Sequence, residues 1–365
     1  MKSHINRKEF LKMSGTVMAA ASFGFPNIII PKRKDTLGVA LVGLGNYSTG
    51  LLAPGLQLTQ HCELRGIVTG SPEKIPVWQE RHNIPDANVY NYENMHQVAG
   101  NDDIDVIYVV TPPGLHAEHS IIGANAGKHV WCEKPMAVTV EECQAIIDAA
   151  TKNRVQLTIG YRMQHEPNTQ TIISYGKNET FGPVTEVRTA AGYRAQGLPA
   201  DDWRFKPEMG GGALYDMGVY PINASRYSTS KKVVAARGTQ RVEREEMFRR
   251  VDETTEFELL FEDDIIATCK TSMGENVNYL EVDTEEGWYF LRPASSYTNV
   301  GGEVSDGTLL EPYTGHQQAR QMDNDALAII ENRPPIVPGE DGMEDIRIVK
   351  AIMESSDKGG DWIYL

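Results

Sequence analysis

Short apolar runs alternate with longer amphipathic stretches in the first half of the chain. The runs at residues 37–42, 64–69, 106–110, 129–132 and 157–159 predict strands. The stretches at residues 116–126 and 140–152 carry apolar positions at helical spacing and predict helices between them. Strands that are apolar on both faces and alternate with helices are typical of a doubly wound parallel sheet. We therefore predict an α/β domain over residues 34–160.

The second half has a different pattern. Residues 184–194, 255–261, 265–271 and 279–282 predict strands, and residues 255–261 alternate apolar and polar positions with period two. Two helices are predicted near the end, at residues 316–331 and 342–355. This pattern predicts an α+β domain over residues 161–365 with an open, mainly antiparallel sheet. The last helices of this domain are expected to return to the first domain.

Residues 1–33 match an export signal followed by an arm. Four cations lie between residues 2 and 12, a run of apolar and small residues follows at 13–25, and Ala19-Ala20-Ala21 offers a cleavage site. The segment NRKEFLK at residues 6–12 is similar to a twin-arginine signal, with Lys8 in place of the second arginine. We expect export, to the periplasm. An ordinary secretory signal or an amphipathic first helix are the alternatives.

Composition narrows the class of protein. The chain has 365 residues, 41% of them hydrophobic, and a net charge of −15. It can build a full core, and its acidity disfavours nucleic acid and anionic membrane surfaces as partners. Four scattered cysteines, without a CxxC pair, are expected to be buried apolar residues, neither a disulfide framework nor a metal site.

A glycine-rich turn follows the first predicted strand. Gly43 suits a tight turn and Gly45 allows a pyrophosphate to approach the backbone, while Asn46 and Tyr47 open a helix whose N-terminus favours anions. Ser48 stands at the third glycine position. The pattern predicts a Rossmann dinucleotide site, and a plain glycine turn is the alternative.

The end of the second strand bears on which dinucleotide is bound. NAD enzymes usually place an acidic residue there for the ribose hydroxyls, whereas this chain has Thr69, Ser71 and Lys74. Hydroxyls and an ammonium group suit a 2′-phosphate, so NADP is favoured over NAD. Glu73 is the counter-argument, because it could bind the ribose if the turn were shifted.

Two further motifs suggest the chemistry. Lys134 follows a strand at the ligand edge of the sheet, and Asp216 and Tyr220 share one face of a predicted helix at i and i+4 spacing. Beside a nicotinamide, these groups suit alcohol–ketone chemistry. Tyr220 would pass the hydroxyl proton with its pKa lowered by Lys134, Lys134 would polarise the carbonyl, and Asp216 would orient the sugar or the lysine.

From about residue 37 onward the chain resembles the Gfo/Idh/MocA family of oxidoreductases. The matching segments are GLGNYS at 43–48, TPPGLHAEH at 111–119, AGKHVWCEKPMAV at 126–138, IGYRMQHEP at 159–167, WRF at 203–205, GGGALYDMGVYPIN at 210–223 and PGEDGMEDIRIVKAIMES at 338–355. Tyr220 stands where many members carry His. With Asn223 and Arg226-Tyr227 it makes the chain similar to the glucose–fructose oxidoreductase branch.

The resemblance implies roles for individual residues. Lys134, Asp216 and Tyr220 would be catalytic. Tyr161 and Arg162 would line the nicotinamide or substrate side, and Trp203 and Arg204 would lie near the substrate. Thr111, His116 and Glu133 would lie at the cofactor. A cis bond is expected before Pro135, and the antiparallel sheet would carry a homodimer or homotetramer interface.

An exported enzyme must carry its NADP along, because free cofactor is scarce outside the cytoplasm. The resulting hypothesis is a ping-pong cycle that oxidises an aldose at its anomeric carbon and reduces a second carbonyl sugar. The alternatives are a sugar or polyol dehydrogenase with exchangeable cofactor, an NAD-dependent glycoside hydrolase, and a non-catalytic sugar-binding protein on the same fold.

Overall fold

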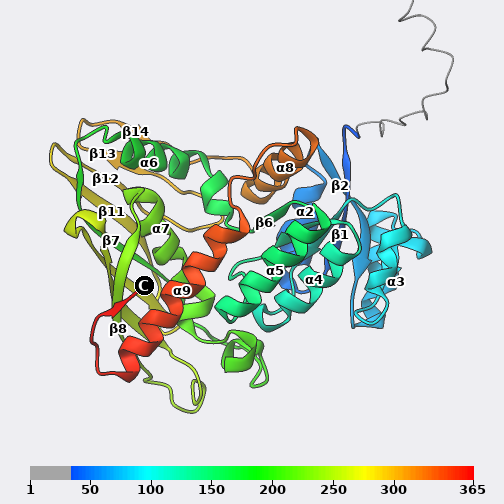
Figure 1. Ribbon diagram of the computed structural model, residues 1–365, viewed down its shortest axis with the longest axis horizontal. Helices are drawn as coiled ribbons and strands as arrows, with labels where there is room; N and C mark the ends of the chain where they lie inside the picture. The colour runs from blue at the N-terminus through cyan, green and yellow to red at the C-terminus, as the bar shows by residue number, and fades with distance from the viewer. Residues whose placement is uncertain (1–33) are drawn as a thin grey trace, which may run out of the picture. The chain divides into compact units, whose positions relative to one another are not determined.

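The computed structural model describes residues 34–365, and Asp35–Leu365 form one compact unit. A six-stranded parallel sheet, in the order β3-β2-β1-β4-β5-β6, occupies the first part of this unit (Figure 1). Its strands are β1 (Leu37–Val42), β2 (Cys62–Val68), β3 (Val89–Tyr90), β4 (Val106–Val109), β5 (His129–Cys132) and β6 (Leu157–Ile159). The order reverses between β1 and β4, which opens a crevice beyond their carboxyl ends.

Helices cover both faces of this sheet, as the apolar strands require. They are α2 (Ala53–Leu56), α3 (Ile75–His82), α4 (His116–Asn125), α5 (Val140–Asn153) and α8 (Gln317–Ile330). Val39 and Leu41 of β1 face a core shared with α2, α3 and α8, whereas Ala40 and Val42 face the opposite core. The predicted doubly wound sheet is confirmed, with strand ends shifted by a few residues.

A nine-stranded sheet forms the second part, in the order β14-β13-β12-β11-β7-β10-β9-β8-β15. Its strands are β7 (Val184–Gly192), β8 (Val233–Arg241), β9 (Thr254–Phe261), β10 (Ile266–Ser272), β11 (Val277–Thr284), β12 (Trp288–Leu291), β13 (Gly302–Val304), β14 (Leu309–Leu310) and β15 (Ile363–Tyr364). Neighbouring strands are antiparallel except β7 and β10, which run parallel. This confirms the mainly antiparallel sheet.

One face of the large sheet is covered by α6 (Pro167–Asn178), α7 (Val219–Thr229) and α9 (Gly339–Asp357) (Figure 1). The two last helices also reach the first sheet. Met322 and Ala326 of α8 pack in the core beneath β1, and Gly342 of α9 lies against β6, where an added Cβ would be 2.9 Å from Ile159.

The remaining expectations concern the N-terminal segment and the cysteines. The predicted export signal at residues 1–33 lies outside the described residues. Across residues 34–365, we find no helix with the length and apolar character of a membrane span. Cys62, Cys132, Cys143 and Cys269 are all buried and free, so the predicted burial of the cysteines is confirmed.

Candidate functional site

The glycine turn lies at the carboxyl end of β1, beside the point where the strand order reverses. Gly43 adopts φ of +95°, and an added Cβ would lie 3.0 Å from Thr111 after β4. Ser48 does more than replace a glycine, because its buried hydroxyl donates to the Gly43 carbonyl at 2.6 Å and locks the turn. The following helix starts with a π-helical turn at Ser48–Leu52, which the sequence pattern did not predict.

A hollow of about 470 Å³ opens beyond this turn and joins most of the predicted site residues. Its lining includes Gly43, Gly45, Asn46, Tyr47, Thr69, Ser71, Lys74, Thr111, Glu133, Lys134, Trp203, Arg204, Asp216 and Tyr220. These come from the ends of β1, β2, β4 and β5 and from the segment that leads into α7. One continuous cavity therefore links the glycine turn to the Lys-Asp-Tyr group.

One end of the hollow is suited to the phosphates of a dinucleotide. No described side chain or backbone lies within 4 Å of a Cβ built on Gly45, so a ligand can approach the backbone there. Lys74 extends across the turn and donates to the Leu44 carbonyl at 2.9 Å, and the Thr69 hydroxyl accepts from the Ser71 amide at 3.1 Å. Glu73 is not part of the lining. Hydroxyls and a cation at this place fit a 2′-phosphate.

The other end holds the three residues of the predicted catalytic set. Lys134 Nζ donates to the Asp216 carbonyl oxygen at 2.7 Å, lies 4.0 Å from Asp216 Oδ1, and lies 4.5 Å from the centre of the Tyr220 ring. The lysine lies two residues after the end of β5, and its peptide bond to Pro135 is cis, as expected. A cation, an anion and a phenol thus face the same space.

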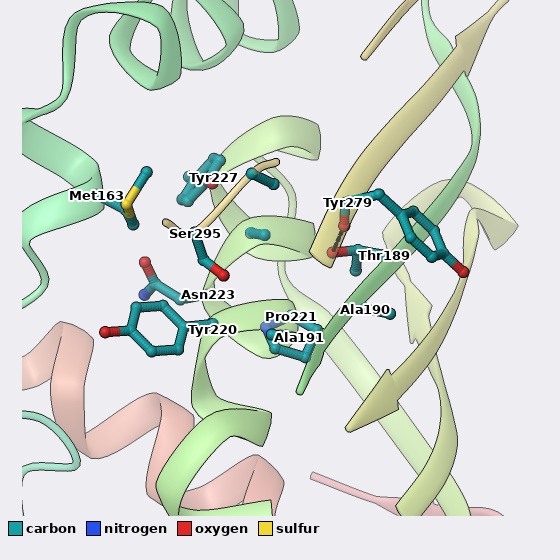
Figure 2. Close-up of a pocket in the computed structure, with 12 residues that line it drawn as sticks. Met163, Thr189, Ala190, Ala191, Tyr220, Pro221, Asn223, Tyr227, Tyr279 and Ser295 are labelled. Atoms are coloured by element: carbon teal, nitrogen blue, oxygen red, sulfur yellow. Dashed lines mark hydrogen bonds between the residues drawn. The ribbon is translucent and has the colours of Figure 1, made fainter. Parts of the chain in front are cut away.

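Asp216 and Tyr220 do not lie on one regular α-helix, which corrects the sequence prediction. Asp216 belongs to a π-helical turn, Leu214–Gly218, and Tyr220 to the first turn of α7. Figure 2 shows the Tyr220 ring projecting from α7 away from β7 and β11. Both side chains still line the hollow.

Three predicted site residues lie behind the lining instead of in it. Tyr161 is buried in the main core. Arg162 is buried as well, where it donates to the Ser295 and Ser296 carbonyls at 2.5 and 2.9 Å, and its guanidinium carbon lies 5.5 Å from the Tyr220 ring centre. In this position, Arg162 supports the wall of the hollow from behind.

His116, the third of these residues, joins the ends of two neighbouring strands. Its ring nitrogens lie 2.9 Å from the Pro135 carbonyl and 2.7 Å from the Thr111 carbonyl. Burial lowers the pKa of His116 to about 4. A neutral imidazole carries one N–H group, so His116 donates a hydrogen bond to only one of these two carbonyls at a time. His116 therefore holds the cis-proline segment near Thr111.

Glu133 is the buried acid of the lining. Its carboxylate accepts from the Tyr108 hydroxyl at 2.6 Å and from the Lys134 amide at 3.2 Å. Burial raises the pKa of Glu133, although the Tyr108 hydrogen bond and Lys134 act in the opposite direction. An added Cβ on Gly160 would lie 2.7 Å from this carboxylate, which explains the glycine after β6.

The sequence did not single out several residues of the site. Tyr297, from the loop after β12, lines the hollow with its ring centre 6.0 Å from that of Tyr47 and 4.4 Å from the Arg162 guanidinium. Asp202 and Tyr92 also line it, and Tyr193 contacts Asp216 from outside. None of them stands in a recognisable motif. Among residues 34–365, no cluster of His, Cys, Asp and Glu could hold a metal ion.

Comparison with known proteins establishes the class. Residues 37–161 match the model of an oxidoreductase family with an NAD-binding Rossmann fold, and residues 169–290 match the GFO/IDH/MocA C-terminal domain. The protein is therefore an NAD(P)-dependent oxidoreductase. It belongs to the Gfo/Idh/MocA family.

Individual relatives extend over nearly the whole chain. The crystal structure of an aldose-aldose oxidoreductase from Caulobacter crescentus is 34% identical, with a TM-score of 0.86, and the match covers 90% of this chain and all of that one. A D-xylose 1-dehydrogenase [NADP(+)] from Haloarcula marismortui is 28% identical over 87% of this chain and 90% of its own length. A D-xylose 1-dehydrogenase (NADP(+)) from Haloferax volcanii is 25% identical, over 87% and 97% respectively.

Proposed function

We propose that the protein is an NADP-dependent sugar oxidoreductase that transfers hydride between the anomeric carbon of an aldose and the nicotinamide. The observation that carries this proposal is the single hollow that joins the Thr69-Ser71-Lys74 end to the Lys134-Asp216-Tyr220 end. The relatives named as NADP-dependent xylose dehydrogenases and as an aldose-aldose oxidoreductase support both the cofactor and the substrate class.

Each residue of the site has a separate role in the proposed reaction. The bound nicotinamide supplies the hydride acceptor. The lining positions Lys134 and Tyr220 beside the space for the sugar. The Tyr220 oxygen, as the phenolate, would take the proton that leaves the reacting hydroxyl and become a phenol, while Lys134 stays protonated. Lys134 brings positive charge to the oxygen on which negative charge develops, and Asp216 keeps that lysine in place through its backbone carbonyl at 2.7 Å. Trp203, which lines the hollow, would provide an apolar surface for a sugar ring.

We further propose export of the protein with its cofactor bound, and a ping-pong cycle in which a second carbonyl sugar reoxidises the reduced cofactor in place. The test starts from purified, undialysed protein, assayed by nicotinamide fluorescence and mass spectrometry before and after addition of glucose or xylose. NADP that copurifies and becomes reduced by the aldose supports the bound-cofactor enzyme. Protein that arrives empty but turns over with added NADP is an exchangeable dehydrogenase. Release of sugar from an aryl glycoside without net reduction identifies a glycoside hydrolase.

The cofactor assignment has its own test, with a matched control on the next residue. Lys74→Met removes the cation at the proposed 2′-phosphate position, so affinity for NADP should fall by roughly 10-fold or more, while affinity for NAD stays the same. Glu73→Gln removes a charge next to Lys74 in sequence, but Glu73 does not line the hollow. This variant should therefore keep its affinity for both NADP and NAD. Calorimetric titration measures all four affinities. Equal losses for NADP and NAD would contradict the assignment.

A further inference from the structure

The carboxylate of Asp216 is held by two side chains that the proposed reaction does not use. Tyr193 donates from its hydroxyl to Asp216 Oδ2 at 2.9 Å, and Arg204 donates from Nε to the same oxygen at 3.0 Å. The Asp216 side chain is 10% exposed, so water competes little for these contacts. Hydrogen bonds to a charged, largely buried group are among the stronger ones in proteins.

Both donors are themselves fixed. Tyr193 follows β7, and its amide donates to the Ser272 carbonyl of β10 at 3.0 Å. The Arg204 guanidinium also lies 3.3 Å from Asp202 Oδ1 and 4.4 Å from the Trp203 ring centre, while its own carbonyl accepts from the Gly212 amide at 2.9 Å. The carboxylate is thus held by two rigid segments.

The second oxygen of Asp216 is different. Among the described residues, the hydrogen bonds to the Asp216 carboxylate are made at Oδ2, whereas Oδ1 has Lys134 Nζ 4.0 Å away. Asp216 lines the hollow, whereas Tyr193 does not. Two donors occupy Oδ2, so the carboxylate is fixed by that oxygen and Oδ1 is left for a contact within the hollow.

We propose that Tyr193 and Arg204 are positioning residues that hold the Asp216 carboxylate by Oδ2 and leave Oδ1 as the acceptor facing the sugar. On this basis, Asp216 orients a substrate hydroxyl beside the Lys134 cation, and the Tyr220 oxygen takes the reaction's proton. The inference rests on the proposed function, because it assigns how the same site binds its sugar.

Tyr193→Phe tests the inference, because it removes only the hydroxyl and keeps the ring in its apolar surroundings. The turnover number for the aldose should fall roughly 10-fold or more, with KM changed much less, because a misaligned carboxylate impairs the geometry of reaction. In an Asp216→Asn background, the same Tyr193→Phe change should alter turnover less than two-fold. Arg204→Lys, which keeps the charge but not the planar donor, should retain more activity than Arg204→Met.

The matched control is Tyr215→Phe. The Tyr215 hydroxyl donates to the Val138 carbonyl at 2.6 Å, so this variant also loses a tyrosine hydrogen bond next to Asp216 in sequence, but not one to its carboxylate. Its turnover should stay within two-fold of wild type. Equal losses in Tyr193→Phe and Tyr215→Phe, or a full Tyr193→Phe effect in the Asp216→Asn background, would overturn the inference. If wild-type protein oxidises no aldose, the proposed function fails instead.

Discussion

Arg226 of α7 joins two carboxylates of α9. It donates to Asp345 Oδ1 at 2.5 Å and to Asp341 Oδ1 at 2.9 Å. The Asp345 side chain has no exposed surface, whereas the Asp341 side chain is 24% exposed. We predict that Arg226→Met, which keeps the apolar stem, destabilises the protein by an amount that grows with pH.

The magnitude follows from the ionisation of Asp345. Burial raises its pKa to about 6, from an ordinary value of 3.8, even though Arg226 opposes the rise. A raised native pKa means that the folded state binds more protons than the unfolded chain, so stability falls as pH rises from about 4 toward 6. At about 1.4 kcal/mol per unit of pKa, the ionised Asp345 costs the wild-type fold about 3 kcal/mol at pH 7.

Without Arg226 the pKa of Asp345 rises further, but protonation limits the cost. At pH 5 the Asp345 carboxyl is protonated in the folded wild type and in folded Arg226→Met. Its ionisation then contributes nothing to the difference in unfolding free energy between the two proteins. At pH 7 this part of the difference is on the order of 1 kcal/mol, and at pH 8 it is larger, on the order of 2–3 kcal/mol. Loss of the guanidinium hydrogen bonds adds about 1–2 kcal/mol at every pH.

Urea unfolding followed by circular dichroism at pH 5, 6, 7 and 8 measures this difference, provided that the slope with urea is equal in both proteins. The control pair is Asp345→Asn with and without Arg226→Met, for which the difference should be nearly independent of pH. A difference between Arg226→Met and wild type that stays constant from pH 5 to 8, or shrinks as pH rises, would refute the reasoning.

Two further predictions concern single buried positions. Gly212→Ala should destabilise the protein by about 2–3 kcal/mol, because Gly212 has φ of +100° and an added Cβ would displace the Asp252 side chain, which accepts a hydrogen bond from the Leu214 amide. Thermal unfolding measures the loss. The control is Gly100→Ala, where the added Cβ meets open space. Asp325→Asn should stabilise the protein at pH 8 but much less at pH 5, because burial raises the pKa of Asp325 well above its usual value and the described residues give its oxygens no hydrogen bond. A stabilisation of equal size at both pH values in urea unfolding would count against the second prediction.

The parallel sheet was the most predictable part of the fold. β1 is buried on both faces along its whole length, so its sequence is a continuous apolar run that a helix or loop rarely shows. β8 was missed for the opposite reason. Its alternation of buried and more exposed positions is broken between Ala235 and Ala236, and it includes Gly238, which lies against Ile352 of α9. The π-helical turns at Ser48 and Leu214 also escaped prediction, since residue spacing alone does not distinguish them from an α-helix.

The cofactor side of the candidate site was also more predictable from the sequence than the substrate side. Gly43, Thr69, Thr111 and Lys134 follow parallel strands, whose carboxyl ends necessarily meet at one edge, so sequence order alone predicts their proximity. No such rule places Tyr193, Asp202 or Tyr297.

Asp202 lies at the hollow in a segment whose tight packing depends on a glycine: an added Cβ on Gly211 would lie 2.6 Å from the Arg204 carbonyl. The cofactor side is thus set by topology, whereas the substrate side is set by loop contacts. Substitutions of lining residues that do not hold Asp216, such as Trp203 and Tyr297, should therefore change which sugar is bound while the group formed by Lys134, Asp216 and Tyr220 stays in place.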